Sequence, residues 1–397
     1  MSYPGGAGVR SQRYVAELDG LRGIAILMVA ISHYAEQTAG KGYDEVFFRA
    51  AQSGWIGVDL FFCLSGYLIT GILLDTRDSA HYLRNFFLKR VLRIFPLYYA
   101  ALGLYFYFFH TITEPGASPI HPLWLYSYGT NVATAIWGWP SRWVGHFWSL
   151  AVEEQFYAVW PFVVLALPRR SLLHACVLLW ILAALLRWAL AGWHHVDPTV
   201  LYVLTPLRID PLMSGAILAA ALREPSGART VATWSRRLLP VAAAAVAVIG
   251  VQGAGYYYWE WSATEQATGY AALAITFACC LGLAVTRASA ATSNSVLRAP
   301  VLLFFGKYSY AIYVFHVWFD TLARRHGLHP TETVGAPGLL LPAILLYSAA
   351  QLALASAAAL VSWNLMEKHM LALKTRLGPG EPHADAAVVS ASSTRGL

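Results

Sequence analysis

The chain has 397 residues, of which 57% are hydrophobic and only 12% are charged. Soluble domains carry roughly 45–50% apolar and about 25% charged residues. This composition excludes an ordinary soluble enzyme, a disordered chain and a disulfide scaffold, and it favours an all-α polytopic membrane protein. The net charge of +7 does not indicate a nucleic-acid partner, because the basic residues lie between apolar runs and not on one polar surface.

Ten apolar stretches, each about 20 residues long, predict ten transmembrane helices. Because 21 of the 28 Lys and Arg residues fall in one set of alternating connections and only five in the other, we expect both termini to be cytoplasmic. The expected location is the plasma (inner) membrane of the cell. The predicted spans are Gly20–Ala39, Trp55–Leu74, Phe95–Ile112, Val144–Leu167, Leu172–Ala191, Leu201–Leu222, Leu238–Gly255, Gln266–Val285, Pro300–Leu322 and Leu339–Trp363. The five basic residues of the outer connections are Lys41, Arg49, Arg142, Arg324 and Arg325.

One integral domain accounts for nearly all of the sequence. We expect a cytoplasmic N-terminal segment (1–17), a transmembrane domain (18–368) and a short cytoplasmic tail (369–397) that is disordered at its end. The four cysteines lie in apolar runs without metal-ligand spacing, so no metal site is predicted. The loop Thr113–Arg142 is the largest outer connection, and we expect it to influence the choice of acceptor.

Ionisable residues at membrane depth are costly and usually mark a functional cavity. In the first span, Asp19 and Arg22 are three residues apart and can pair, and His33 shares the face of Arg22 to within about 20°. Histidine is suited to general-base catalysis, although a hydrogen-bonded packing role is the alternative. Asp59, one turn into the second span, is expected to lie near His33, unless it only complements the helix dipole.

Two arginines lie three residues apart at the cytoplasmic end of the third span. Arg90 and Arg93 would share one helical face, which suits binding to phosphate groups. Ordinary membrane topology and contact with lipid headgroups are the alternative explanation. We expect Pro96 to start or kink the following helix and so to fix the direction of the arginines.

The fourth span contains two adjacent glutamates, which are expensive to place in lipid. Ser149, Glu153 and Tyr157 follow one another at intervals of four residues and form one stripe, and Glu154 shares a flank with Tyr157. Trp148 precedes this stripe. The pattern indicates a polar cavity, with a structural interhelical network as the alternative.

Two later spans also carry polar residues. Arg208 and Asp210 lie between two prolines, which should break the helix and free backbone groups to line a cavity. Ser309, Tyr313 and His316 lie on one face of the ninth span, where aromatic packing is the alternative interpretation.

Five motifs in order resemble the membrane-bound acyltransferase-3 family, from about Tyr14 to Lys368. They are Leu-Asp-Gly-Leu-Arg-Gly with the later histidine, Gly-Val-Asp-Leu-Phe-Phe-x-Leu-Ser-Gly-Tyr-Leu-Ile, Lys-Arg-x-x-Arg-Ile-x-Pro-x-Tyr, Trp-Ser-Leu-x-x-Glu-Glu-Gln-Phe-Tyr and Tyr-Ser-Tyr-x-x-Tyr-x-x-His. The resemblance implies an integral membrane O-acyltransferase. Such an enzyme moves an acyl group, most often acetyl, from cytoplasmic acyl-CoA to a hydroxyl, usually of a sugar in an exported glycan.

The resemblance also assigns roles to particular residues. The essential histidine of the family maps to His33, its first-span arginine to Arg22, and its paired arginines to Arg90 and Arg93. The Trp-Ser…Glu-Glu segment maps to the residues of the fourth span named above. No permanently bound cofactor is implied, since acyl-CoA is a co-substrate.

From these residues we expect Arg90 and Arg93 to bind the phosphates of CoA. His33, oriented by Asp59 or Glu153, would then deprotonate the acceptor hydroxyl or would itself be acylated briefly. The acceptor is a glycan or lipid-linked sugar, with a metabolite such as a macrolide as the alternative. A transporter or flippase for lipid-linked sugars and a non-catalytic regulator are the rival classes.

Overall fold

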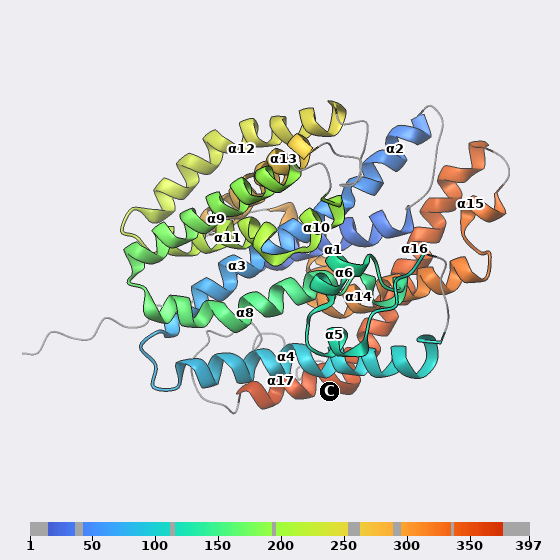
Figure 1. Ribbon diagram of the computed structural model, residues 1–397, viewed down its shortest axis with the longest axis horizontal. Helices are drawn as coiled ribbons and strands as arrows, with labels where there is room; N and C mark the ends of the chain where they lie inside the picture. The colour runs from blue at the N-terminus through green and yellow to red at the C-terminus, as the bar shows by residue number, and fades with distance from the viewer. Residues whose placement is uncertain are drawn as a thin grey trace, which may run out of the picture.

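A computed structural model describes residues 15–35, 43–111, 116–192, 196–252, 263–288, 295–334 and 337–375, and the regular secondary structure in these ranges is helical (Figure 1). Helices are favoured because apolar surroundings require every backbone polar group to be satisfied within the protein. Most of the N-terminal segment and of the tail predicted from the sequence lies outside the described residues. The helical structure of the described ranges and the long apolar helices among them confirm an all-α membrane protein.

Long helices run side by side along most of the molecule (Figure 1). The short helices that connect them lie mostly in the right half of this view (Figure 1). The longer elements are α1 (Ala16–Tyr34), α2 (Tyr43–Gln52), α3 (Gly57–Thr76), α4 (Tyr82–Leu104), α8 (Trp148–Ala166), α9 (Arg169–Ala191), α11 (Ile209–Ala221), α12 (Gly227–Gln252), α13 (Ala263–Ala288), α14 (Pro300–Arg325) and α16 (Pro337–Ser362). The shorter ones are α5 (Pro122–Tyr126), α6 (Thr130–Trp137), α7 (Arg142–Gly145), α10 (Pro198–Val203), α15 (Pro330–Thr333) and α17 (Lys368–Thr375).

Seven helices of the described chain are long and apolar enough to cross a membrane, and they fall on seven of the ten predicted spans. The other three predicted spans correspond to α1, α8 and α11. The first two carry acidic or basic residues, and α11 has only 13 residues. The multi-pass architecture is thus supported, while length and composition alone do not establish the number of ten. The seven helices are Glu45–Thr76, Tyr82–Phe109, Arg169–Ala191, Gly227–Gly250, Glu265–Ala288, Pro300–Thr333 and Leu339–Leu373.

Two predicted boundaries change. The helix expected from Phe95 begins at Tyr82, and Pro96 lies inside it, so Arg90 and Arg93 occupy α4 itself. The span expected at Leu201–Leu222 is interrupted between α10 and α11 by a single 3-10 turn, Thr205–Leu207. This interruption confirms the helix break expected near Arg208 and Asp210.

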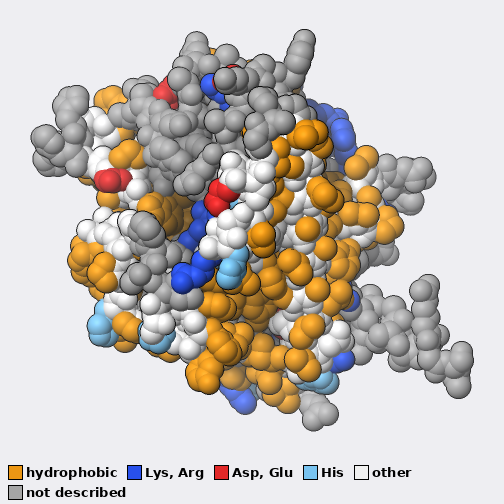
Figure 2. Space-filling model, turned by 90° about the vertical axis from the view of Figure 1, so that its right-hand side faces the viewer, with side chains coloured by type: hydrophobic (Ala, Val, Ile, Leu, Met, Phe, Trp, Pro, Cys, Tyr) orange, Lys and Arg blue, Asp and Glu red, His pale blue; other side chains and the backbone are white. Residues whose placement is uncertain are grey.

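The helices α1 and α3 pack against each other and against the helices around them. α1 contacts α3, α13, α14 and α16, and α3 contacts α8, α11 and α13. Figure 2 looks onto the end of the bundle that carries α2 and α15, where Lys and Arg side chains gather near the centre beside acidic and histidine side chains. Polar groups on α1 are therefore enclosed by other helices.

Glycines allow α3 and α11 to cross closely. A Cβ atom on Gly66 would lie 1.9 Å from the carbonyl oxygen of Leu212, and one on Gly215 would lie 2.0 Å from the carbonyl oxygen of Cys63. Glycine is therefore required at both positions, because any side chain there meets backbone atoms of the other helix.

Replacement of Gly215 by valine should separate α3 from α11. We expect a loss of about 1–3 kcal/mol or more of folding free energy, since neither backbone can move without disturbing its other contacts. The measurement is the midpoint of thermal unfolding in detergent. Gly103→Ala is the matched control, because a Cβ atom at Gly103 meets nothing within 4 Å. A variant Gly215→Val that unfolds at the wild-type temperature would contradict this packing.

Candidate active site

His33 lies in the last turn of α1, in a partly buried position. Its Nδ1 atom is 2.8 Å from the carbonyl oxygen of Val29 and 3.4 Å from Nε2 of His316. Because a carbonyl oxygen can only accept, Nδ1 of the neutral ring carries the proton and donates it to Val29. The other ring nitrogen, Nε2, then holds the lone pair that a general base needs.

His316 and a further histidine, His146, lie beside this ring. The ring centroids of His33 and His316 are 4.9 Å apart, and those of His146 and His316 are 5.3 Å apart. His316 Nδ1 donates to the carbonyl oxygen of Tyr313 at 2.8 Å, which leaves Nε2 of His316 as an acceptor facing His33. The predicted face of the ninth span therefore does meet His33.

Tyr313 connects this group to α8. Its hydroxyl lies 2.5 Å from Oγ of Ser149 and donates to the carbonyl oxygen of His146 at 2.9 Å. Trp148 is buried next to Ser149 and packs its ring on Tyr202, with centroids 4.6 Å apart. Ser149 and Tyr313 are thus polar members of the site, while Trp148 contributes packing.

A second polar group joins α3 and α8. Glu153 accepts a short hydrogen bond from Ser65, and Oγ of Ser65 is 2.7 Å from the hydroxyl of Tyr157. Glu153 and Tyr157 therefore do lie on one face of α8, and both meet Ser65 of α3.

Three arginines act electrostatically on this carboxylate. Glu153 interacts electrostatically with Arg22 of α1 and with Arg90 and Arg93 of α4. Arg90 also interacts with Glu154, and its guanidinium lies 5.9 Å from the centre of the Tyr157 ring. The structure thus brings together basic residues from two helices.

α1 links this basic region to His33. Arg22 pairs with Asp19 at 3.0 Å, as their spacing predicted. Eleven residues of helix separate Arg22 from His33, a distance of about 17 Å along the axis. The two polar groups therefore lie at different depths of the bundle.

Asp59 does not lie in either group, which corrects an expectation from the sequence. Its completely buried carboxylate pairs with Arg208 at 2.7 Å and makes no hydrogen bond to His33. A buried carboxylate requires a cation, and Arg208, itself completely buried, supplies it. Glu153, the other residue expected to orient His33, is hydrogen-bonded to Ser65 and likewise makes no hydrogen bond to His33.

Arg208 and Asp59 belong to a larger buried network. Arg187 of α9 forms a two-point ion pair with Asp210 at 2.8 and 3.1 Å. The guanidinium of Arg208 lies 4.1 Å from the centre of the Tyr270 ring. Arg208 and Asp210 therefore have structural roles. Arg208 fixes the interrupted helix to α3 through Asp59, and Asp210 fixes it to α9 through Arg187.

The sequence did not single out several residues of the site. Ser65 contacts Glu153, and His146 contacts Tyr313 and His316. Asp320 reaches His33 only through Arg142 and Arg324, which were counted only as basic residues of outer loops. The spacing of four residues between His316 and Asp320 was the one available signal. Within the described ranges, no group of three or more His, Cys, Asp or Glu residues could hold a metal ion.

The family model described as an acyltransferase domain (Acyl_transf_3) matches residues 15–363. The chain belongs to the acyltransferase-3 family. No solved structure matches the chain.

Curated relatives of this acyltransferase are named for O-acetylation. It is 32% identical to the peptidoglycan O-acetyltransferase OatA of Listeria monocytogenes over 53% of this chain and 34% of the relative. It is 32% identical to the putative peptidoglycan O-acetyltransferase YrhL of Bacillus subtilis over 52% of this chain and 33% of the relative. It is 26% identical to the O-acetyltransferase OatA of Staphylococcus aureus over 77% of this chain and 50% of the relative. The aligned regions thus span a third to a half of these relatives.

Proposed function

We propose that this acyltransferase is a plasma-membrane O-acetyltransferase, which moves acetyl from cytoplasmic acetyl-CoA to a sugar hydroxyl of an exported glycan. The observation that carries the proposal is the arrangement along α1. Basic residues that act electrostatically on Glu153 lie near one end, and His33, whose Nε2 is the unprotonated ring nitrogen, lies near the other. The arginines suit the phosphates of CoA, and the imidazole suits the acyl transfer itself.

The proposed orientation follows from the distribution of Lys and Arg in the sequence. It places both termini and the Arg22 end of α1 in the cytoplasm, with ten spans in all. Arg90 and Arg93 then face the compartment that contains acyl-CoA. The thin pantetheine arm of CoA extends between helices from these arginines toward His33.

The proposed chemistry uses one nitrogen atom. Nε2 of His33 takes the proton of the acceptor hydroxyl while the hydroxyl oxygen attacks the thioester carbonyl. The carbon–sulfur bond breaks, and the departing CoA thiolate takes the proton back from the imidazolium. In the alternative route, Nε2 attacks the thioester carbonyl, the carbon–sulfur bond breaks, and CoA leaves as a thiolate to give a brief acyl-histidine. The hydroxyl oxygen then attacks the acyl carbon, the bond to Nε2 breaks, and the hydroxyl proton passes to the thiolate.

We propose a peptidoglycan sugar as the acceptor, because two of the relatives are named as peptidoglycan O-acetyltransferases. The loop that ends at Arg142 supports an acceptor site on the outer side of His33. Arg142 reaches the carbonyl oxygen of His33 at 3.4 Å, so this loop adjoins the proposed base. Acceptor specificity then depends on the surroundings of this loop.

Replacement of Arg90 or Arg93 by glutamine should weaken binding of acetyl-CoA. A charge-assisted hydrogen bond contributes about 1.5–3 kcal/mol, so the dissociation constant should rise by about tenfold or more. The measurement is equilibrium binding of labelled acetyl-CoA to purified protein. Arg84→Gln, an exposed position on the same helix, is the matched control. Unchanged affinity in both variants would leave these arginines a purely topological role and contradict the proposed donor site.

A further inference from the structure

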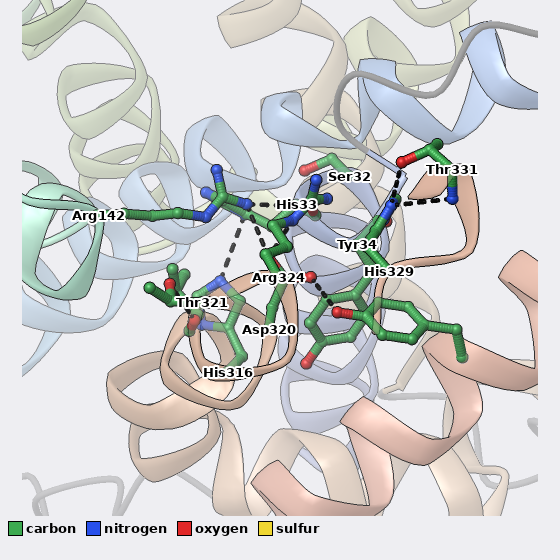
Figure 3. A network of polar contacts seen from close by, with 12 residues as sticks. Ser32, His33, Tyr34, Arg142, His316, Asp320, Thr321, Arg324, His329 and Thr331 are labelled. Atoms are coloured by element: carbon green, nitrogen blue, oxygen red, sulfur yellow. Dashed lines mark hydrogen bonds and ion pairs between the residues drawn. The ribbon is translucent and has the colours of Figure 1, made fainter. Parts of the chain in front are cut away.

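One face of α14 contacts both the ring and the backbone of His33. His316, Asp320 and Arg324 follow one another at intervals of four residues, so they form a stripe along this helix. Nε2 of His316 is 3.4 Å from Nδ1 of His33, and a guanidinium nitrogen of Arg324 is 3.3 Å from the carbonyl oxygen of His33 (Figure 3). A single helix thus holds one residue at two points.

Asp320 is the centre of the backbone contact. Its completely buried carboxylate accepts from Arg142 at 2.8 Å, from Arg324 at 2.9 Å and from the hydroxyl of Tyr347 at 2.8 Å. Both arginines also reach the carbonyl oxygen of His33, at 3.4 and 3.3 Å. Asp320 therefore acts on His33 only through these two guanidinium groups, which it holds in place.

The position of His33 explains why such contacts matter. The last four carbonyl groups of an α-helix have no partner inside the helix, and His33 lies in the last turn of α1. Here the final carbonyls receive side-chain donors from other elements. Tyr34 accepts from Nε2 of His329 at 3.1 Å, and Ala35 accepts from Nε2 of Gln52 at 2.9 Å. Cations at this end are also favoured by the helix dipole.

The contact to the ring has a definite hydrogen-bond polarity. His316 donates through Nδ1 to the carbonyl oxygen of Tyr313, so its Nε2 can only accept. It faces the Nδ1–H of His33, which also points at the carbonyl oxygen of Val29. His316 thus stands where a carboxylate often stands beside a catalytic histidine, and it keeps Nε2 of His33 unprotonated.

We propose that His316 and Asp320 are positioning residues for His33, an inference that rests on the catalytic role proposed above for this histidine. His316, together with the carbonyl oxygen of Val29, fixes the tautomer and the orientation of the ring. Asp320, through Arg142 and Arg324, fixes the backbone turn that carries it. The two residues replace Asp59 and Glu153, which the sequence suggested for this task.

Two substitutions at position 316 test the ring contact. His316→Phe keeps an aromatic ring but removes the acceptor, and it should lower kcat by about 10²-fold, because small misplacements of a catalytic group have effects of this size. The KM for acetyl-CoA should stay within about twofold, since the proposed donor site lies toward the Arg22 end of α1, about 17 Å along that helix from His33. His316→Gln offers a carboxamide oxygen as the acceptor and should recover most of the rate. Thr321→Val, a buried neighbour whose hydroxyl bonds only within α14, is the control.

The backbone contact is tested at Arg324 and Asp320. Arg324→Gln and the isosteric Asp320→Asn should each lower kcat and leave the KM for acetyl-CoA within about twofold. Arg325→Gln, at an exposed neighbouring position, should match the wild type. Binding of acetyl-CoA reports that each variant is folded.

The outcomes separate this inference from the proposed function. A His33→Ala variant with full activity overturns the function and the inference together. If His33→Ala is inactive but His316→Phe and Asp320→Asn turn over like the wild type, only the inference is overturned. It is also overturned if His316→Gln is as slow as His316→Phe, because acceptor chemistry would then be irrelevant and only ring packing would matter.

Discussion

Replacement of His33 by alanine is expected to lower the rate of acetyl transfer by about 10²–10⁴-fold, the usual contribution of a general base. Affinity for acetyl-CoA should not change, because the proposed donor site lies toward the Arg22 end of α1, about 17 Å along that helix from His33. The measurements are transfer of labelled acetyl to a glycan acceptor and equilibrium binding of acetyl-CoA, both with purified protein.

His174→Ala is the control for this experiment, since it removes an exposed imidazole from α9. Full activity of His33→Ala would show that the imidazole takes no part in the mechanism. A loss of acetyl-CoA binding equal to the loss of rate would instead indicate that His33 supports the donor site. The proposed separation of the donor site from His33 along α1 would then be wrong.

The second large effect concerns the pair of Asp59 and Arg208, which is expected to stabilise the fold and not to take part in transfer. Both side chains are completely buried, so Asp59→Ala leaves a guanidinium group without its carboxylate. Breaking a buried pair in this way costs about 3–5 kcal/mol. We expect a clear fall in the midpoint of thermal unfolding in detergent.

The double replacement Asp59→Leu with Arg208→Met removes both charges and should recover much of this loss, as apolar substitutes for buried pairs often do. Asp75→Asn on the same helix is the control. Its pair with Arg223 is partly exposed and should contribute at most about 1 kcal/mol. An Asp59→Asn variant that unfolds like the wild type but fails to transfer acetyl would restore Asp59 as a residue that orients His33.

Spacing along single helices predicted much of the site. The intervals between Arg22 and His33, between Glu153 and Tyr157, and between Tyr313 and His316 each placed residues on one face, and these faces do meet. Helical periodicity gives the direction of a side chain relative to its neighbours on the same helix. It therefore predicts which residues face inward together.

The choice between partners on different helices could not be predicted in the same way. Asp59 pairs with Arg208, which is 149 residues away in the sequence, and Arg142 pairs with Asp320 across 178 residues. On charge alone, Arg187, Arg208 and the imidazole of His33 were all plausible partners for Asp59. Only the packing of α3 against α11 decides this.

The outer arginines illustrate another limit of composition. Arg142 and Arg324 lie at the ends of predicted spans, where basic residues need no special explanation. Their common contact with His33 arises because α7, α14 and the end of α1 meet. Composition also fails for two helices inside the bundle. Hydropathy does not detect α1 and α8 as membrane-spanning helices, because both carry acidic residues.

The most direct test of the central claim is acetyl transfer by the purified enzyme in proteoliposomes, with labelled acetyl-CoA and a peptidoglycan oligomer. The account predicts an acetyl ester on a sugar hydroxyl and one free CoA for each ester formed, with neither product above background in His33→Ala. Movement of a lipid-linked sugar across the membrane with no consumption of acetyl-CoA would contradict it and would favour a transporter.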